Sequence, residues 1–244
     1  MNVLRHLHRP WTLLSLFTLV VVAALIPASA SALLSGPAPS LGAAGSFAVL
    51  AGTAVTCTDS TVTGNVGVYP GVPITQTSCP VTGTLNGGDT VAAQAHDDFL
   101  VAYDAFKALP CDQGLATLDG QTLSPGVYCF DSAATSTGGV LTLDGPADGI
   151  WIFKIGTLGT GALTGTNFTV IRKDGTPLSC NSVYWSVADA VTMTDSKFVG
   201  TVLAGAAVTL TRGTFNGNAY AKNAATTTGA AITGCTLGGS VAPF

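Results

Sequence analysis

The 244-residue chain carries a formal net charge of −4, and only 9% of its residues are charged. This balance argues against nucleic acid as a partner, because phosphate groups require clustered Lys and Arg, and no basic patch is visible. Asp supplies every acidic residue, while Gly, Thr, Ala and Val dominate, so the composition predicts a mostly β protein with many tight turns.

Residues 1–32 have the features of a secretory signal peptide. A basic start precedes an apolar run over residues 11–26, and small residues allow cleavage after Ala30 or Ala32. A membrane anchor is the alternative, but the run is shorter than the roughly 20 apolar residues that span a bilayer. We therefore expect a secreted, extracellular protein with no membrane association after signal cleavage, followed by a short linker at residues 33–40.

The domain is expected to cover residues 41–244, with one helix at about residues 89–109. Asp89 can cap this helix, and Pro110 stops it. Apolar residues recur at helical spacing and must cover another part of the fold; they are Val91, Ala95, Phe99, Ala102 and Phe106. His96, within the same segment, is predicted to face solvent.

Six cysteines in an exported chain favour disulfides over metal ligands. They are Cys57, Cys79, Cys111, Cys129, Cys180 and Cys235. Many connectivities are open, and neighbour pairing along the chain is our expectation because it closes the shortest loops.

Segments of the C-terminal third repeat with a period of 17 residues, which aligns Phe198, Phe215 and Ile232. So short a period with strand-like content is typical of coils stacked in a β-solenoid. A similar register occurs near the start of the domain, where Thr58 and Thr61 sit like Thr211 and Thr214. A solenoid interrupted in sequence but continuous in space would explain this distance along the chain.

Alternation along each coil predicts threonine ladders on an outer face, because successive strand side chains point to opposite sides. The predicted surface consists of Thr58, Ser60, Thr61, Thr192, Thr194, Ser196, Thr209, Thr211, Thr214, Thr226 and Thr228. The plainer interpretation is that Thr merely suits a solvent-facing strand.

Catalytic and metal-binding patterns are not visible. One histidine remains after signal cleavage, no G-x-S-x-G places a nucleophile, and disulfide-bonded cysteines cannot serve as zinc ligands. We therefore predict no enzyme activity, no metal and no cofactor. Asn167 begins the only N-glycosylation sequon, which is relevant only in a eukaryotic source.

Several stretches, among them "LGAAGSFAVLAGTAVT", "GDTVAAQAHDDFLVAYDAF", "LTLDGPADGIWIFKIG" and "FVGTVLAGAAVTLTRGTFNG", resemble the microbial ice-binding (antifreeze) protein family in the family's order. The resemblance implies a right-handed discontinuous β-solenoid with one long α-helix packed alongside and a flat face that binds ice. It also implies T-(A/G)-x-(T/N) tetrads on that face. Four tetrads match it in part, and in three of them Asp or Arg takes the second place; they begin at Thr58, Thr194, Thr211 and Thr228.

These features predict a secreted monomer that adsorbs to ice crystals through a flat Thr-rich solenoid face and inhibits ice growth and recrystallisation. The alternative is a non-enzymatic carbohydrate-binding or adhesion module, which exposed aromatic side chains would favour. Trp151 and Trp185 instead lie in strand-like apolar contexts that favour core positions.

Overall fold

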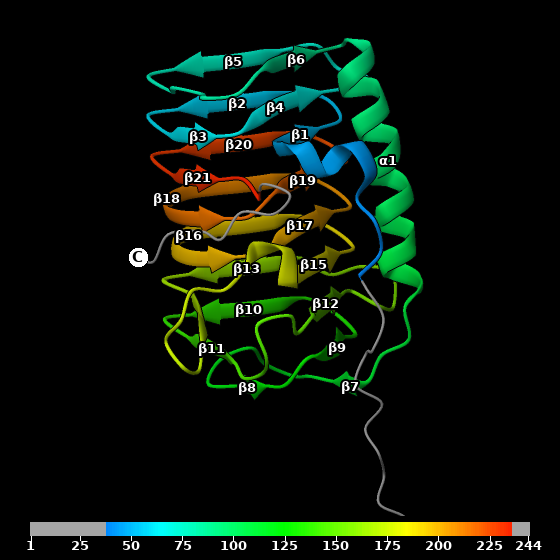
Figure 1. The fold of residues 1–244 in the computed structure, drawn as a ribbon, viewed down its shortest axis with the longest axis vertical. Helices are drawn as coiled ribbons and strands as arrows, with labels where there is room; N and C mark the ends of the chain where they lie inside the picture. The colour runs from blue at the N-terminus through cyan, green and yellow to red at the C-terminus, as the bar shows by residue number, and fades with distance from the viewer. Residues whose placement is uncertain (1–37, 236–244) are drawn as a thin grey trace, which may run out of the picture. The chain divides into compact units, whose positions relative to one another are not determined.

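Residues 38–235 are described by the computed structural model. The predicted signal peptide at residues 1–32 and most of the predicted linker at 33–40 lie outside the described residues, as do residues 236–244. The described chain forms coils stacked into a β-solenoid, with one α-helix lying alongside (Figure 1). Across residues 38–235, no helix combines the length and apolarity needed to cross a bilayer.

A nine-stranded sheet lies next to the helix, and we call it the helix-side face. Its strands pair in parallel, as stacked coils require. In spatial order they are β6 (Leu85–Gly87), β4 (Asn65–Val68), β1 (Phe47–Ala51), β19 (Ala219–Ala221), β17 (Thr201–Ala204), β15 (Val183–Val187), β12 (Trp151–Ile155), β9 (Gly126–Phe130) and β7 (Gln113–Gly114).

The remaining strands form two further faces, because the chain turns twice more in each coil. One face is built by β5 (Ile74–Thr77), β2 (Val55–Thr58), β20 (Ala225–Thr228), the first halves of β18 (Val208–Asn216) and β16 (Val191–Val199), β13 (Leu163–Thr166) and β10 (Ala134–Thr137). The other, which we call the third face, holds β3 (Thr61–Thr63), β21 (Ala231–Thr233), the second halves of β18 and β16, β14 (Thr169–Arg172), β11 (Val140–Leu143) and β8 (Thr122–Leu123).

The coils are not stacked in chain order. Strand β1 pairs with β19, so that Val49 lies opposite Ala219, and the first coil stacks directly on the last (Figure 1, blue beside red). After β6 the helix carries the chain along the stack, and the later coils return toward β1. The solenoid is therefore discontinuous in sequence and continuous in space, as predicted.

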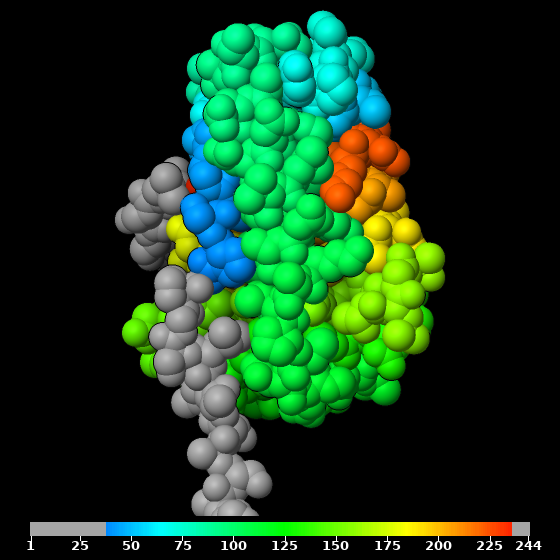
Figure 2. All heavy atoms as spheres, turned by 90° about the vertical axis from the view of Figure 1, so that its right-hand side faces the viewer, coloured from blue at the N-terminus to red at the C-terminus, as the bar shows by residue number. Residues whose placement is uncertain are grey.

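Helix α1 spans Thr90–Ala108, close to the predicted residues 89–109, after a short 3-10 helix η1 (Gly42–Ser46) and strands β1 to β6. The Asp89 side chain accepts a hydrogen bond from the Ala92 N–H at 2.8 Å and so caps the first turn. Figure 2 shows α1 running along the solenoid with η1 beside it.

The buried stripe of α1 differs from the prediction at two residues. Val91 is 55% exposed, and the adjacent Ala92 is buried in its place. His96 is buried, which contradicts its predicted exposure, because the stripe that contains Ala95 and Phe99 is wide enough to include it. Burial lowers the pKa of His96 and favours the neutral imidazole, which packs among aromatic rings.

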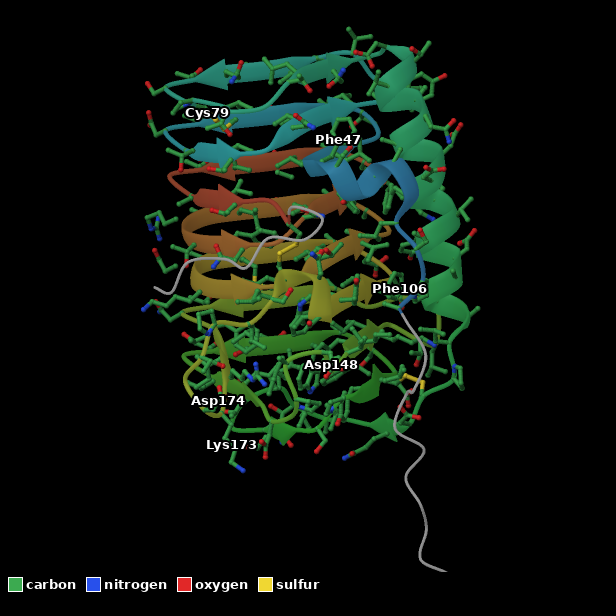
Figure 3. The ribbon with its side chains drawn as sticks, viewed as in Figure 1. Phe47, Cys79, Phe106, Asp148, Lys173 and Asp174 are labelled. Atoms are coloured by element: carbon green, nitrogen blue, oxygen red, sulfur yellow. A yellow bond between two sulfur atoms is a disulfide. The ribbon has the colours of Figure 1, made fainter. Side chains whose placement is uncertain are left out.

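Aromatic side chains stack from coil to coil inside the solenoid. Ring centroids are 4.1 Å apart between Phe153 and Trp185, 4.9 Å between Trp185 and Phe198, and 5.3 Å between Phe198 and Phe215. Trp151 and Trp185 are both buried, which confirms the core positions expected for them. A second cluster lies between α1 and the helix-side face, where Figure 3 shows Phe106.

The six cysteines form three disulfides, paired as neighbours along the chain as expected: Cys57 with Cys79, Cys111 with Cys129, and Cys180 with Cys235. The Cα atoms of each pair are 5.8 to 5.9 Å apart, within the range that a disulfide requires. The second bridge joins the segment just after α1 to β9, so it fastens the end of the helix to the solenoid.

Removing the second bridge with a Cys111→Ala/Cys129→Ala double variant should lower the free energy of unfolding by about 3 kcal/mol, because an 18-residue loop is no longer closed in the unfolded chain. Urea unfolding followed by circular dichroism measures this change. An unaltered unfolding midpoint would show that the bridge contributes nothing to stability.

A threonine-lined face as the candidate functional site

Two files of threonine cross seven coils of the solenoid, and we call the surface that they form the threonine face. In the first file, in spatial order, are Thr75, Thr56, Thr226, Thr209, Thr192, Thr164 and Thr135. In the second are Thr77, Thr58, Thr228, Thr211, Thr194, Thr166 and Thr137. We call the two threonines that one strand contributes to this face a rung, so the face has seven rungs.

Strand alternation places these threonines outward. In β16, Thr192 and Thr194 are partly exposed, while Val191 and Met193 between them are buried. Neighbouring rungs are separated by the inter-strand distance of about 4.7–4.9 Å, and the two files by roughly 6.6 Å, the rise of two strand residues. The threonines thus form a regular two-dimensional array.

A third file of small apolar residues runs beside the threonines, two positions before the first threonine of each rung. It consists of Pro73, Ala54, Ala224, Ala207, Ala190, Ala162 and Ala133. Main-chain hydrogen bonds hold this file in register, for example from the Ala225 N–H to the Ala54 carbonyl and from the Val208 N–H to the Ala224 carbonyl, both at 3.0 Å. None of the three files contains a charged residue.

The surface predicted from the sequence lacks four of the seven rungs in whole or in part. The missed threonines are Thr56, Thr75, Thr77, Thr135, Thr137, Thr164 and Thr166. The signal that identifies them is A-x-T-x-T, which occurs six times, with P-x-T-x-T as the seventh rung. Only the last three coils keep the 17-residue period, while the Ala133, Ala162 and Ala190 rungs are 29 and 28 residues apart, so a fixed period overlooked them.

Each rung ends in a residue with a left-handed backbone conformation, where the chain turns from the threonine face to the third face. This corner column contains Ser78, Asp59, Gly229, Arg212, Asp195, Asn167 and Gly138, with φ between 47° and 69°. A positive φ is uncommon for residues other than glycine, yet every coil adopts it here. The corner therefore fixes the edge of the threonine face.

Two residues of the predicted surface, Ser60 and Ser196, are buried, so the prediction was wrong for them. The left-handed corner residue interrupts the strand alternation, and the next side chain points inward. Ser196 donates to the Thr194 carbonyl at 2.9 Å and accepts from the Phe168 N–H at 3.2 Å. Ser60 is bonded in the same way, which makes both serines structural parts of the corner.

Thr61 and Thr214 lie on the third face rather than the threonine face. Their predicted alignment is confirmed, since both pair with Ala231, but the corner separates them from the threonine files. Their column continues to Lys197 and Thr169, so it is neither uniform nor free of charge.

Comparison with known proteins gives the family. Residues 49–233 match the Ice-binding-like family, which is more than half of the chain. The chain belongs to this family. An ice-binding protein from Nostoc sp. (strain HG1) is 38% identical over 180 residues, covering 71% of this chain and 64% of that protein. Ice-binding protein K3-B1 from Typhula ishikariensis is 34% identical over 220 residues, covering 79% of this chain and 87% of that protein.

Solved structures of the ice-binding family share the fold. An ice-binding protein from an Antarctic biological consortium superposes with a TM-score of 0.74 at 30% identity, over 91% of this chain and 96% of that chain. The ice-binding protein of Antarctomyces psychrotrophicus gives a TM-score of 0.70 at 32% identity, over 80% and 98% of the two chains. The discontinuous solenoid with its helix is therefore an architecture of ice-binding-like proteins.

Three charged residues of this ice-binding-like domain, Asp59, Asp195 and Arg212, border the threonine face in the corner column. Arg212 donates from Nε and Nη2 to the two carboxylate oxygens of Asp195, both at 2.6 Å, and this hydrogen bonding lowers the pKa of the Asp195 carboxyl. Asp59 makes no ion pair with any residue between 38 and 235. Asn167 is exposed in the same column, and its glycosylation stays a prediction.

Metal ligands do not gather in the described part of the ice-binding-like domain. Among residues 38–235, no group of three or more His, Cys, Asp or Glu side chains is placed to hold a metal ion.

Proposed function

We propose that the protein adsorbs to ice through the threonine face and thereby inhibits ice growth and recrystallisation. The observation that carries the proposal is the array itself: two straight files of seven threonines, beside a file of alanines and one proline, with no charged side chain among them. Membership of the ice-binding-like family supports it.

The chemistry of threonine suits a solid water surface. Each methyl group restricts the orientation of neighbouring water, and each hydroxyl anchors a water molecule by a hydrogen bond. Repeated at the strand spacing, these groups hold a layer of ordered water that can merge with the ice lattice. The array is about 30 Å long, since seven rungs at the strand spacing have six intervals between them, so many weak contacts act together.

Rigidity is the second requirement, because mobile side chains would disturb that layer. The β-branched threonines have few χ1 rotamers, and parallel main-chain hydrogen bonds hold every rung. The aromatic stack and two disulfides, Cys57–Cys79 and Cys180–Cys235, support the strands from within. Ice that meets adsorbed molecules can advance only as curved fronts between them, which lowers the local freezing point.

The carbohydrate-binding or adhesion alternative receives less support. A sugar platform needs exposed aromatic rings, but in the described chain the large hydrophobic side chains with high exposure are all Val, Leu or Ile. We further propose that the protein acts as a secreted monomer, on the basis of its predicted signal peptide and its disulfides, which persist in oxidising surroundings.

The test is growth of a single ice crystal in a solution of purified residues 33–244 carrying a fluorescent label. We expect the label to concentrate on the ice surface and the crystal to become faceted. Labelled serum albumin serves as the control for nonspecific inclusion. Exclusion of the label from the ice, with unrestricted crystal growth, would contradict the proposal.

A further inference from the structure

Three charged residues occupy the corner column, at the edge of the threonine face. Asp195 follows Thr194 and Arg212 follows Thr211, so the two stand beside adjacent rungs at the middle of the array. Their side chains form a bidentate ion pair, which we call the corner pair. Asp59 stands two rungs from Arg212, on the far side of Gly229.

The side chain of Arg212 lies against the space where a side chain at Gly229 would be. A Cβ atom at Gly229 would lie 3.3 Å from Arg212 Cγ, so a side chain at this corner would crowd the arginine. The rung between Arg212 and Asp59 therefore carries no group that could compete for the guanidinium. The guanidinium therefore pairs with Asp195, and the corner pair lies beside two adjacent rungs, those of β18 and β16.

Stability does not account for the corner pair. An ion pair between exposed side chains contributes little, since its charges are screened by solvent. Both residues also adopt a positive φ, at 51° for Asp195 and 54° for Arg212, which glycine tolerates without cost. All seven corner residues share this conformation, so it does not explain why Asp195 and Arg212 carry opposite charges.

We propose that the corner pair neutralises the edge of the threonine face beside Thr194 and Thr211 and so preserves adsorption to ice, an inference that rests on the proposed function. Two of the five guanidinium N–H donors bond to the two carboxylate oxygens, and the opposite charges lie side by side, as in bidentate Arg–carboxylate pairs generally. The two charges therefore largely cancel each other's field at the water above Thr194 and Thr211. The pair makes the edge of the central rungs resemble the uncharged edge beside Gly138 and Asn167.

The experiment compares Arg212→Gly, Asp195→Asn and the double variant with the parent. Gly and Asn occupy the same left-handed corner at Gly138 and Asn167, so the backbone accepts both substitutions. Each single variant exposes one unpaired charge and should weaken adsorption to ice about fivefold, whereas the double variant should return to within about twofold of the parent. Asp59→Asn, which breaks no ion pair, is the matched control and should not weaken adsorption.

Two readouts separate this inference from the proposed function. If the folded parent does not adsorb to ice, the proposed function fails. If the parent adsorbs and the single variants match it, or the double variant is weaker than both, the corner pair has no such role. Carboxyl NMR titration supplies a measurement without ice: the pKa of Asp195 should rise in Arg212→Gly, and an unchanged pKa would show that the pair does not form in solution.

Discussion

Replacing Thr211 with Tyr should weaken adsorption to ice by about tenfold or more, a loss of roughly 1.4 kcal/mol or greater in binding free energy. Thr211 belongs to the fourth of seven rungs, so a phenol ring there stands above the centre of the array. It keeps the ice surface away from Thr194 and Thr228 on the neighbouring rungs. The fold should persist, because Tyr suits an outward strand position and surface substitutions change stability by less than about 1 kcal/mol.

Thr61→Tyr is the matched control for Thr211→Tyr. Thr61 is exposed on the third face, in β3, which directly follows the β2 rung of Thr56 and Thr58 along the chain. The same bulk is added there without touching either threonine file, so adsorption should equal that of the parent. Loss of adsorption in Thr61→Tyr, with full retention in Thr211→Tyr, would assign ice binding to the third face.

Replacing Phe99 with Ala should lower the free energy of unfolding by about 3–5 kcal/mol. Phe99 is fully buried between α1 and the helix-side face, where its ring centroid lies 5.6 Å from that of Tyr220 and 6.3 Å from that of Tyr103. Its removal leaves a cavity at the contact between the helix and the last coil. Thermal and urea unfolding both measure the loss.

Val101→Ala, on the same helix, is the control for Phe99→Ala. Val101 is 71% exposed, so its truncation opens no cavity and should change stability by less than about 0.5 kcal/mol. Equal effects of the two substitutions would show that α1 is not held by its buried stripe. Ice adsorption of the folded fraction should be unchanged in both variants, because neither residue lies on the threonine face.

Local signals in the sequence predicted much of the fold. The cap at Asp89 and the stop at Pro110 bounded the helix, and the 17-residue period aligned Phe198 with Phe215. These signals work because each depends on residues close in the chain. His96 was misplaced because its polarity suggested solvent, whereas its position on the helix places it against Phe99.

The candidate site was predicted less completely, for a geometric reason. A single left-handed residue at each corner reverses the strand alternation, and Asp59 or Asp195 gives no sign of this in the sequence as a glycine would. Ser60 and Ser196 were therefore assigned to the surface although they point inward. The rungs that contain Thr135 and Thr164 were missed because the 17-residue period does not extend to them. The loop at residues 144–150, between β11 and β12, lengthens the coil that separates these two rungs.

The contact between β1 and β19 means that the threonine array is assembled from both ends of the chain. The two rungs of β5 and β2 join the four of β18, β16, β13 and β10 through β20, which follows all six of these strands along the chain. A nascent or truncated chain that stops before Ala225 therefore carries two separate short arrays instead of one long array. Such distant pairing also folds slowly, because its loop must close before the contacts form. The threonine face is therefore continuous only when β20 has docked between β2 and β18.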